Sequence, residues 1–391
     1  MNGSNAAAAP PRGFRDILPT EARELRAIER GLAETFASYG YVPLDPPTVE
    51  HTSAAAIVAG EKQMRFLDRD GALIAMRPDI TTAIARLVAQ RYADGSGALR
   101  LSYFAPVFRE EPAMLGTERE YVQAGAELVG PSGPLADAEA LALLAESLAC
   151  AGLHDQTIEV GHIGVVRALF DDLDAGARDQ VLELLRRGDH VGAFDVSRDA
   201  GMSGRAIAWA RRALSARGFA DLEALDVPRI DELREVLALA RAMFGGDWAV
   251  PNLGIIPALP YYTGVVFEAL RPDLGFPLAT GGRYDLLLAA FGADRPATGF
   301  AIDVPRLHLA LFNAGWRPRE ERTLVSLTPS DPATTARVAG ALRGIGLTVA
   351  VGAVAEAAGM TVVSASVAED GRLRLADGRS LTADELAREL R

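Results

Sequence analysis

The first long apolar pattern of the chain has helical spacing. Apolar positions recur every three or four residues after Thr20, whose hydroxyl is placed to cap a helix, and Gly40 is placed to end it. These apolar positions are Leu25, Ile28, Leu32 and Phe36. We therefore predict a long amphipathic helix behind the turn-rich lead-in Gly13–Pro19.

Strand patterns and helix patterns alternate irregularly over the next part of the chain. Asp70-Gly71 between apolar flanks predicts a hairpin within Leu67–Met76. Two more helices are predicted, at Thr81–Tyr92 and Asp137–Gly152. The further predicted strands are Leu99–Val107, Tyr121–Val129, Thr157–Ile163, Tyr261–Leu270 and Ala297–Val304. Strands joined through loops, with helices around them, indicate an α+β fold with an antiparallel sheet rather than repeated βαβ units.

Two regions stand apart from this pattern. From about Val165 to Asp247, leucine, alanine, arginine and acidic residues recur at helical spacing, which predicts a helical insertion over about 165–247. A charged linker, Glu320–Arg322, precedes a small α/β domain. Its predicted elements are the strands Thr323–Leu327, Leu347–Val351 and Thr361–Ala365, a hairpin at Asp370-Gly371, and the helices Ala333–Arg343 and Thr382–Leu390. The predicted organisation is a flexible arm over 1–12, a core over 13–322 and a small domain over 323–391.

Composition and charge exclude several classes of function. The single cysteine, Cys150, excludes a disulfide framework, and the five histidines show no metal-site spacing, so neither a metal nor a cofactor is expected. The formal net charge of −12 disfavours nucleic acid as a partner, because no basic run is longer than a pair. The sequence shows no export signal and no membrane-spanning stretch, and we expect a cytoplasmic location.

Candidate binding chemistry begins in the run Arg77–Thr82. A carboxylate at Asp79 and a hydroxyl at Thr81 lie two residues apart, at the end of a hairpin and the start of a helix. Together they can hold an ammonium group. The alternative is that one of them simply caps the following helix.

A second candidate segment is Phe108-Arg109-Glu110-Glu111, followed by the strand Tyr121–Val129. Strand alternation places Gln123, Gly125 and Glu127 on one face. Polar side chains at that spacing suggest the floor of a pocket. A salt-bridge network between strand edges is the alternative.

Two more segments follow the helical insertion. Tyr261 and Tyr262 stand at a predicted strand entrance, where they can offer ring faces and hydroxyls to a planar ligand or serve as core aromatics. Gly281-Gly282 precedes Arg283-Tyr284-Asp285 and permits close backbone approach, although glycine pairs are also common in plain turns.

Taken together, these segments resemble histidyl-tRNA synthetases, a family of class II aminoacyl-tRNA synthetases. Gly13–Pro19 is similar to the N-terminal signature of that family, and Phe108–Glu111 to the class II motif 2 pattern Phe-Arg-x-Glu. Tyr261–Glu268 is similar to the histidine-specific loop, and Gly281–Asp285 with Gly299–Arg306 to the approach to motif 3 and motif 3 itself. The resemblance implies a six-stranded antiparallel sheet with flanking helices, and dimerisation.

The resemblance also implies roles in a histidine pocket. Asp79 and Thr81 stand where the family holds the histidine ammonium, with Asp in place of the usual Glu. Glu127 and a tyrosine hydroxyl would hold the two imidazole nitrogens, whose donor and acceptor pattern marks histidine. The implied histidine-binding residues are Asp79, Thr81, Arg109, Gln123, Glu127, Tyr261, Tyr262 and Tyr284.

Departures from the synthetase pattern decide the expected activity. Those enzymes carry Arg-Gly-Leu-Asp before the tyrosine pair, and this chain has Pro257-Ala258-Leu259-Pro260. The missing arginine is the one that stabilises charge as the histidine carboxylate attacks ATP, and losing one such group typically costs about 10²–10³ in rate. A degenerate nucleotide site is therefore expected, and its residues are Glu111, Asp303 and Arg306. Asp303 and Pro305 replace a glycine and a glutamate of motif 3, and the C-terminal domain is shorter than the anticodon-binding domain of that family.

A kept pocket with lost activation chemistry resembles a paralogous family, the regulatory subunits of ATP phosphoribosyltransferase. The resemblance implies a non-catalytic subunit that activates a short-form catalytic subunit in a hetero-oligomer and lets L-histidine inhibit it. It implies self-association as a dimer and no tRNA partner. The alternatives are a divergent histidyl-tRNA synthetase, motivated by Arg109, Glu111 and Arg306, and an amino-acid ligase that works without tRNA.

Overall fold

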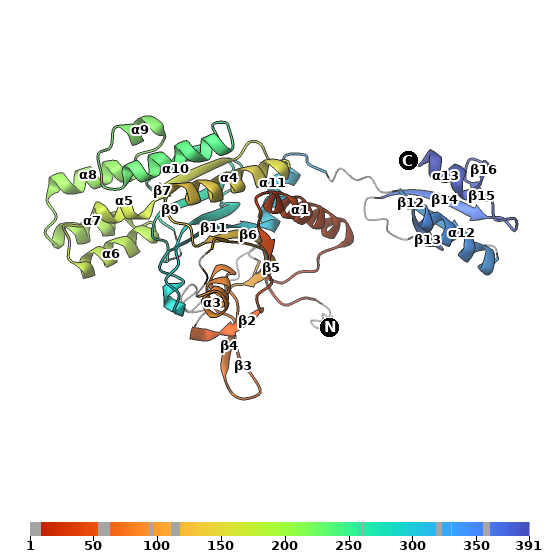
Figure 1. Ribbon diagram of the computed structural model, residues 1–391, viewed down its shortest axis with the longest axis horizontal. Helices are drawn as coiled ribbons and strands as arrows, with labels where there is room; N and C mark the ends of the chain where they lie inside the picture. The colour runs from red at the N-terminus through yellow and green to blue at the C-terminus, as the bar shows by residue number, and fades with distance from the viewer. Residues whose placement is uncertain are drawn as a thin grey trace, which may run out of the picture. The chain divides into compact units, whose positions relative to one another are not determined.

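The computed structural model in Figure 1 divides into two compact units, a larger one of Met1–Asp16 with Ile28–Trp316 and a smaller one of Ile17–Ala27 with Arg317–Arg391. The structure describes residues 9–53, 63–93, 95, 97–110, 118–257, 259, 261–317, 323–329, 331–354 and 360–390.

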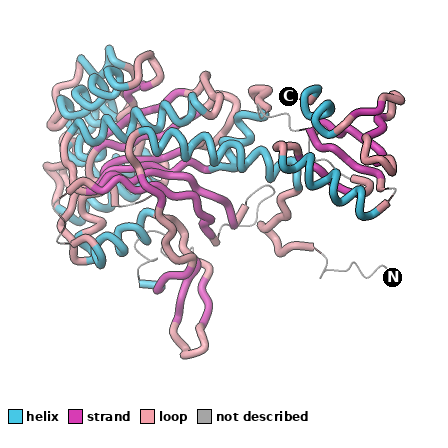
Figure 2. The backbone as a smooth tube through the Cα atoms, turned by 45° about the vertical axis from the view of Figure 1, so that its right-hand side comes forward, coloured by secondary structure: helices cyan, strands magenta, loops and turns pink. Residues whose placement is uncertain are grey.

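An eight-stranded sheet forms the centre of the larger unit (Figure 2). Six neighbouring strands pair antiparallel, in the spatial order β5 (Leu99–Phe108), β6 (Glu120–Val129), β11 (Ala297–Asp303), β10 (Ala279–Arg283), β9 (Val265–Leu270) and β7 (Thr157–His162). Short parallel strands, β1 (Val42–Pro43) and β8 (Ala249–Pro251), add one strand at each edge. The predicted α+β fold is confirmed, and the expected count of six strands is corrected to eight because these two edge strands were not predicted.

Helices cover one face of this sheet. They are α4 (Pro134–Cys150), α11 (Val304–Asn313) and the part of α1 (Pro19–Ser38) from Ile28 onward. The ring of Phe36 on α1 lies 5.7 Å from that of Phe104 and 5.8 Å from that of Phe300, which ties the helix to β5 and β11. The predicted cap at Thr20 is wrong, since the helix already begins at Pro19, and a proline suits the first turn because its missing N–H is not needed there.

The opposite face carries the polar side chains and is bordered by smaller elements. Helix α3 (Thr81–Arg91) follows a three-stranded sheet of β2 (Val49–His51), β4 (Leu73–Met76) and β3 (Arg65–Leu67), in that spatial order. The hairpin of β3 and β4 confirms the prediction made from Asp70-Gly71. A short 3-10 helix, η2 (Ala289–Phe291), packs against α3.

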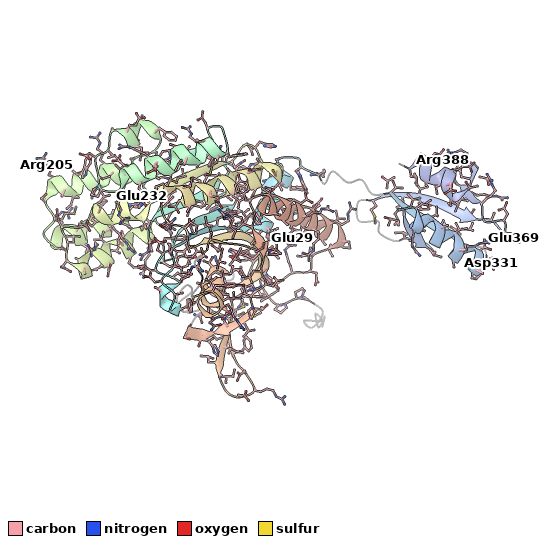
Figure 3. The ribbon with its side chains drawn as sticks, viewed as in Figure 1. Glu29, Arg205, Glu232, Asp331, Glu369 and Arg388 are labelled. Carbon is pink, nitrogen blue, oxygen red and sulfur yellow. The ribbon has the colours of Figure 1, made fainter. Side chains whose placement is uncertain are left out.

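The predicted helical insertion is a run of helices with buried apolar stripes. They are α5 (Ile163–Ala168), α6 (Ala175–Arg186), α7 (His190–Asp199), α8 (Gly204–Leu214), α9 (Phe219–Glu223) and α10 (Ile230–Met243). Helix α10 packs against α4, which joins the insertion to the helical layer. Charged residues of the insertion are exposed, as Arg205 on α8 illustrates in Figure 3. None of the helices in the described part of the chain is long and apolar enough to cross a membrane.

The smaller unit is a mixed five-stranded sheet with two helices. The strand order is β13 (Thr348–Val351), β12 (Thr323–Thr328), β14 (Thr361–Val367), β15 (Leu373–Leu375) and β16 (Ser380–Leu381). Asp331, labelled in Figure 3, caps α12 (Pro332–Gly344) by accepting a 2.7 Å hydrogen bond from the Thr334 amide. A capping box between Thr382 and Glu385 starts α13 (Ala383–Glu389). Apolar side chains of both helices and of the sheet form its core.

Candidate functional site

A pocket opens on the polar face of the large sheet, beside the start of α3. All eight residues predicted to bind histidine line it, and it encloses about 360 Å³ of empty space including its opening. The remaining lining residues are Leu259, Thr280, Gly299, Phe300 and Ala301. We call this the inner pocket.

The strand register explains how Glu127 reaches the floor of the inner pocket. Glu127 on β6 lies opposite Gly299 on β11. A Cβ atom added at Gly299 would overlap the Glu127 carboxylate and press on the Ala126 carbonyl oxygen. The bare glycine backbone therefore supplies the space that the carboxylate occupies. Gly125 does the same for the ring of Tyr103, its cross-strand partner on β5.

Hydroxyl groups hold the Glu127 carboxylate on both sides. Thr81 donates through Oγ1 to Oε1 at 2.7 Å, and Tyr284 donates through its hydroxyl to Oε2 at 2.5 Å. Glu127 is only 1% exposed, and burial raises its pKa to about 8. Burial therefore favours the protonated form at neutral pH, and a hydrogen-bond donor from a ligand would favour the charged form.

Asp79 is the second acid of the inner pocket, and its carboxylate makes no hydrogen bond of normal geometry among the described residues, although the Thr82 hydroxyl and amide and the Arg109 guanidinium lie near enough to favour its charged form. Its side chain is buried, and neither carboxylate oxygen has a partner at normal geometry among the described residues. Burial raises its pKa to about 6. The alternative reading as a helix cap is not realised, since Ile80 precedes α3 and no side chain caps that helix. An unsatisfied buried carboxylate calls for a ligand group that donates hydrogen bonds.

Arg77 fixes the segment that carries Asp79. Its buried guanidinium donates to the Pro106 carbonyl oxygen at 2.8 Å and to the Pro46 carbonyl oxygen at 2.5 Å. Its backbone accepts from the Phe108 amide at 2.9 Å. These bonds lock the turn between β4 and α3 against β5, so Asp79 is held by backbone contacts rather than by partners of its own.

Three tyrosine rings close one side of the inner pocket. Tyr261 lies 4.8 Å from Tyr262 and 5.7 Å from Tyr284 between ring centroids. The prediction of a strand from Tyr261 is wrong, because β9 begins only at Val265. The tyrosines lie in the turn before it, where the strand register no longer constrains them.

Hydrogen bonds tie that turn to the end of β10. The Thr263 amide donates to the Arg283 carbonyl oxygen at 2.8 Å, and the Asp285 amide donates to Thr263 Oγ1 at 3.1 Å. The buried Arg283 guanidinium pairs with Asp137 and Asp285, both at 2.9 Å. The run Gly281–Asp285 thus positions Tyr284 and the tyrosine pair together.

A second, larger pocket adjoins the first and shares six lining residues with it. This outer pocket encloses about 760 Å³ including its opening, and it contains Asp303 and Arg306, the residues predicted for a degenerate nucleotide site. Arg306 Nε lies 3.0 Å from Asp303 Oδ2, and Asp303 also caps α11 through the Arg306 amide at 3.0 Å. Glu111, Ala258 and Pro260 lie outside the described residues.

Arg109 stands where the two pockets meet. It lines both, donates through Nε to the Pro78 carbonyl oxygen at 3.2 Å, and has its guanidinium carbon 5.6 Å from the centre of the Tyr121 ring. The neighbouring Glu110 pairs with Arg119 at 2.5 Å on the surface. Among the described residues of these two segments, the suggested salt-bridge network is therefore that one exposed pair, and Arg109, Gln123 and Glu127 line the pockets.

Several residues of the site were not predicted, among them Tyr103 and Glu268. Tyr103 is buried beneath the inner pocket, and its hydroxyl has no hydrogen-bond partner in the described residues. Tyr103 lies opposite Gly125 on the neighbouring strand, and Gly125 lies two residues before Glu127. A glycine on the pocket face of a strand was the sequence signal that a large side chain could lie there. Glu268 lines the outer pocket, and its sequence signal was its place at the end of the run that resembles the histidine-specific loop. Within the described residues, no group of three or more metal-binding side chains is present.

Known proteins share both the sequence and the fold of this chain. The model of the histidyl-tRNA synthetase family matches residues 13–307. An ATP phosphoribosyltransferase regulatory subunit of Symbiobacterium thermophilum is 38% identical over 363 residues, which span 87% of this chain and 90% of the relative. A regulatory subunit of the same description from Moorella thermoacetica is 39% identical over 78% of this chain and 83% of its own length.

A solved structure agrees with these relatives. A Bacillus halodurans protein, described as an ATP phosphoribosyltransferase regulatory subunit/histidyl-tRNA synthetase, superposes with a TM-score of 0.79 at 27% identity, over 91% of this chain and 98% of that one. The chain belongs to the histidyl-tRNA synthetase family, and within that family to the regulatory subunits of ATP phosphoribosyltransferase.

Proposed function

We propose that the inner pocket is the receptor for L-histidine in a non-catalytic regulatory subunit. The subunit activates a short-form ATP phosphoribosyltransferase catalytic subunit in a cytoplasmic hetero-oligomer, and bound histidine inhibits that assembly. The chain pairs with a second copy of itself and uses no tRNA and no cofactor. The observation that carries the proposal is the buried, unpartnered Asp79 carboxylate facing the same pocket as Glu127.

The chemistry of the pocket suits each polar group of histidine. The ammonium group supplies the donors that Asp79 lacks, and the charge of the ligand compensates the buried carboxylate. An imidazole N–H can donate to Glu127, whose two oxygens are already oriented by Thr81 and Tyr284. Arg109 lies at the pocket mouth, where a free carboxylate would reach its remaining N–H groups.

The chain lacks the groups that would activate histidine by reaction with ATP. The sequence Pro257–Pro260 supplies no guanidinium where histidyl-tRNA synthetases have one. Arg306 is engaged by Asp303, which lies on the wall of the outer pocket and places a carboxylate where a phosphate would approach. A pocket that binds an amino acid but cannot stabilise the charge of phosphoryl chemistry is suited to sensing.

Histidine-dependent exchange of pyrophosphate into ATP tests the loss of synthetase activity. We expect no exchange above background from the purified chain, under conditions in which it binds L-histidine. An authentic histidyl-tRNA synthetase from the same assay serves as the positive control. Robust exchange would overturn the proposal in favour of a divergent synthetase or a ligase, both of which need an adenylate.

A further inference from the structure

The inner and outer pockets adjoin each other. Six residues line both of them: Arg109, Gln123, Leu259, Tyr262, Thr280 and Ala301. A ligand whose histidine head fills the inner pocket therefore has room beyond its carboxyl carbon. The outer pocket is the larger of the two, at about 760 Å³ against about 360 Å³, each including its opening.

One of the two basic groups in the outer pocket is already satisfied. Arg306 pairs with Asp303 at 3.0 Å, donates through Nη1 to the Pro277 carbonyl oxygen at 2.9 Å, and has its guanidinium carbon 4.7 Å from the centre of the Phe276 ring. The ion pair has no net charge, and moving Arg306 toward an anion would leave Asp303 without its partner. Arg306 is therefore a poor receptor for a phosphate or carboxylate.

The other basic group, Arg109, lies at the junction of the pockets. The oxygen atoms on the carboxyl carbon of histidine would meet it first, because it lines the inner pocket as well. A histidine amide presents a neutral carbonyl oxygen to Arg109, and the positive charge of Arg109 already acts on the carboxylates of Asp79 and Asp303, where it favours their charged forms. This leaves the outer pocket without a free cation among the charged residues that line it.

One acid of the outer pocket remains uncompensated. The carboxylate of Glu268 on β9 has no ion pair or hydrogen bond within the described residues, and it is half-buried. Its cross-strand partner on β7 is Glu159, another acid, whose own carboxylate accepts a 2.6 Å hydrogen bond from Asn252. Burial raises the pKa of Glu268, and the charge of Glu159 adds to that effect. Like charges directly opposite each other are unfavourable, and a nearby cation relieves them.

We propose that the outer pocket is a subsite for a group attached to the carboxyl carbon of histidine, selective for cationic or neutral groups over anionic ones. Glu268 is the residue that sets this selectivity, and the fixed Asp303–Arg306 pair removes the counter-charge that an anion would need. The ligand class is thus histidine amides and histidine-first peptides with a basic second side chain. The inference rests on the proposed histidine pocket.

Calorimetric titration of the full chain with three matched amides tests the subsite. The ligands are L-histidyl-L-lysine amide, L-histidyl-L-glutamine amide and L-histidyl-L-glutamate amide, with L-histidine as reference. We expect affinity to fall in that order, with the lysine ligand at least about tenfold tighter than the glutamate ligand at low salt. In the Glu268→Gln variant the same ratio should fall below about threefold. Glu223→Gln, which removes an exposed acid of the helical insertion, should keep the wild-type ratio.

The outcomes separate this inference from the proposed function. Equal affinities for the three amides, with L-histidine bound normally, would overturn the subsite and leave the histidine pocket standing. If Glu268→Gln kept the wild-type ratio of affinities between the lysine and glutamate ligands, Glu268 would not be the residue that sets the selectivity. Failure of L-histidine to bind, with the charge order among amides intact, would refute the histidine pocket alone. Failure of every ligand to bind would refute both.

Discussion

Replacing Asp79 with Asn should weaken L-histidine binding about 100-fold. The ammonium group of the ligand then loses a buried charged acceptor, and an interaction of this kind is worth about 3 kcal/mol. The side-chain volume is nearly unchanged. Because the Asp79 oxygens make no hydrogen bond of normal geometry with the described residues, the substitution should not destabilise the fold. Isothermal titration calorimetry at pH 7.5 measures the effect.

Two comparisons make the Asp79 result specific. Asp226→Asn changes an exposed aspartate of the helical insertion in the same way and should leave the affinity within about twofold of wild type. The melting temperature of Asp79→Asn without ligand should be equal to or above that of wild type, because an unpaired buried charge is removed. Wild-type affinity in Asp79→Asn would show that the ammonium group binds elsewhere.

Replacing Glu127 with Gln should flatten the pH dependence of stability above neutrality. The pKa of Glu127 is raised to about 8 in the folded chain, and an unfolded glutamate titrates near 4.5. Between these values the folded state holds a proton that the unfolded state has released, so stability falls as pH rises. Between pH 6.5 and pH 8, the ionisation of Glu127 lowers the free energy of unfolding by about 2 kcal/mol. Asp79, with a pKa of about 6, contributes mainly below this window.

Urea unfolding of the ligand-free chain at pH 6.5 and pH 8 measures the Glu127 contribution. The free energy of unfolding of wild type should drop more across this interval than that of Glu127→Gln, by about 2 kcal/mol. Histidines and other groups titrate in both proteins, so their effects cancel in the comparison. Equal slopes would mean that the Glu127 carboxylate is already ionised in the folded chain at neutral pH.

Much of the pocket floor was predictable because strand alternation is a local property. Gln123, Gly125 and Glu127 were placed on one face from sequence spacing, and the register of β6 against β11 and β5 agrees. The insertion and the small unit were also recognisable from period and turn signals. The grouping of Asp79 with the tyrosine run came from the resemblance to a family, since those segments lie far apart in the chain.

Other features depend on contacts that no local pattern encodes. The start of β9 at Val265 follows from hydrogen bonds between Thr263 and the end of β10, which joins residues about 20 positions apart. The two edge strands, β1 and β8, are too short to show any period. Asp303 is the residue that caps α11, and Arg306 lies in the first turn of that helix. Their ion pair therefore forms only because the helix begins at this position.

If the retained histidine pocket regulates a partner enzyme, the rate of that enzyme must depend on this chain and on L-histidine. A short-form ATP phosphoribosyltransferase catalytic subunit is assayed alone, with this chain, and with the Asp79→Asn variant, each across a titration of L-histidine. We predict that both forms of the chain raise the rate, that histidine inhibits the wild-type assembly, and that the Asp79→Asn assembly resists it. A catalytic subunit whose rate ignores this chain, or equal inhibition of both assemblies, would contradict the account.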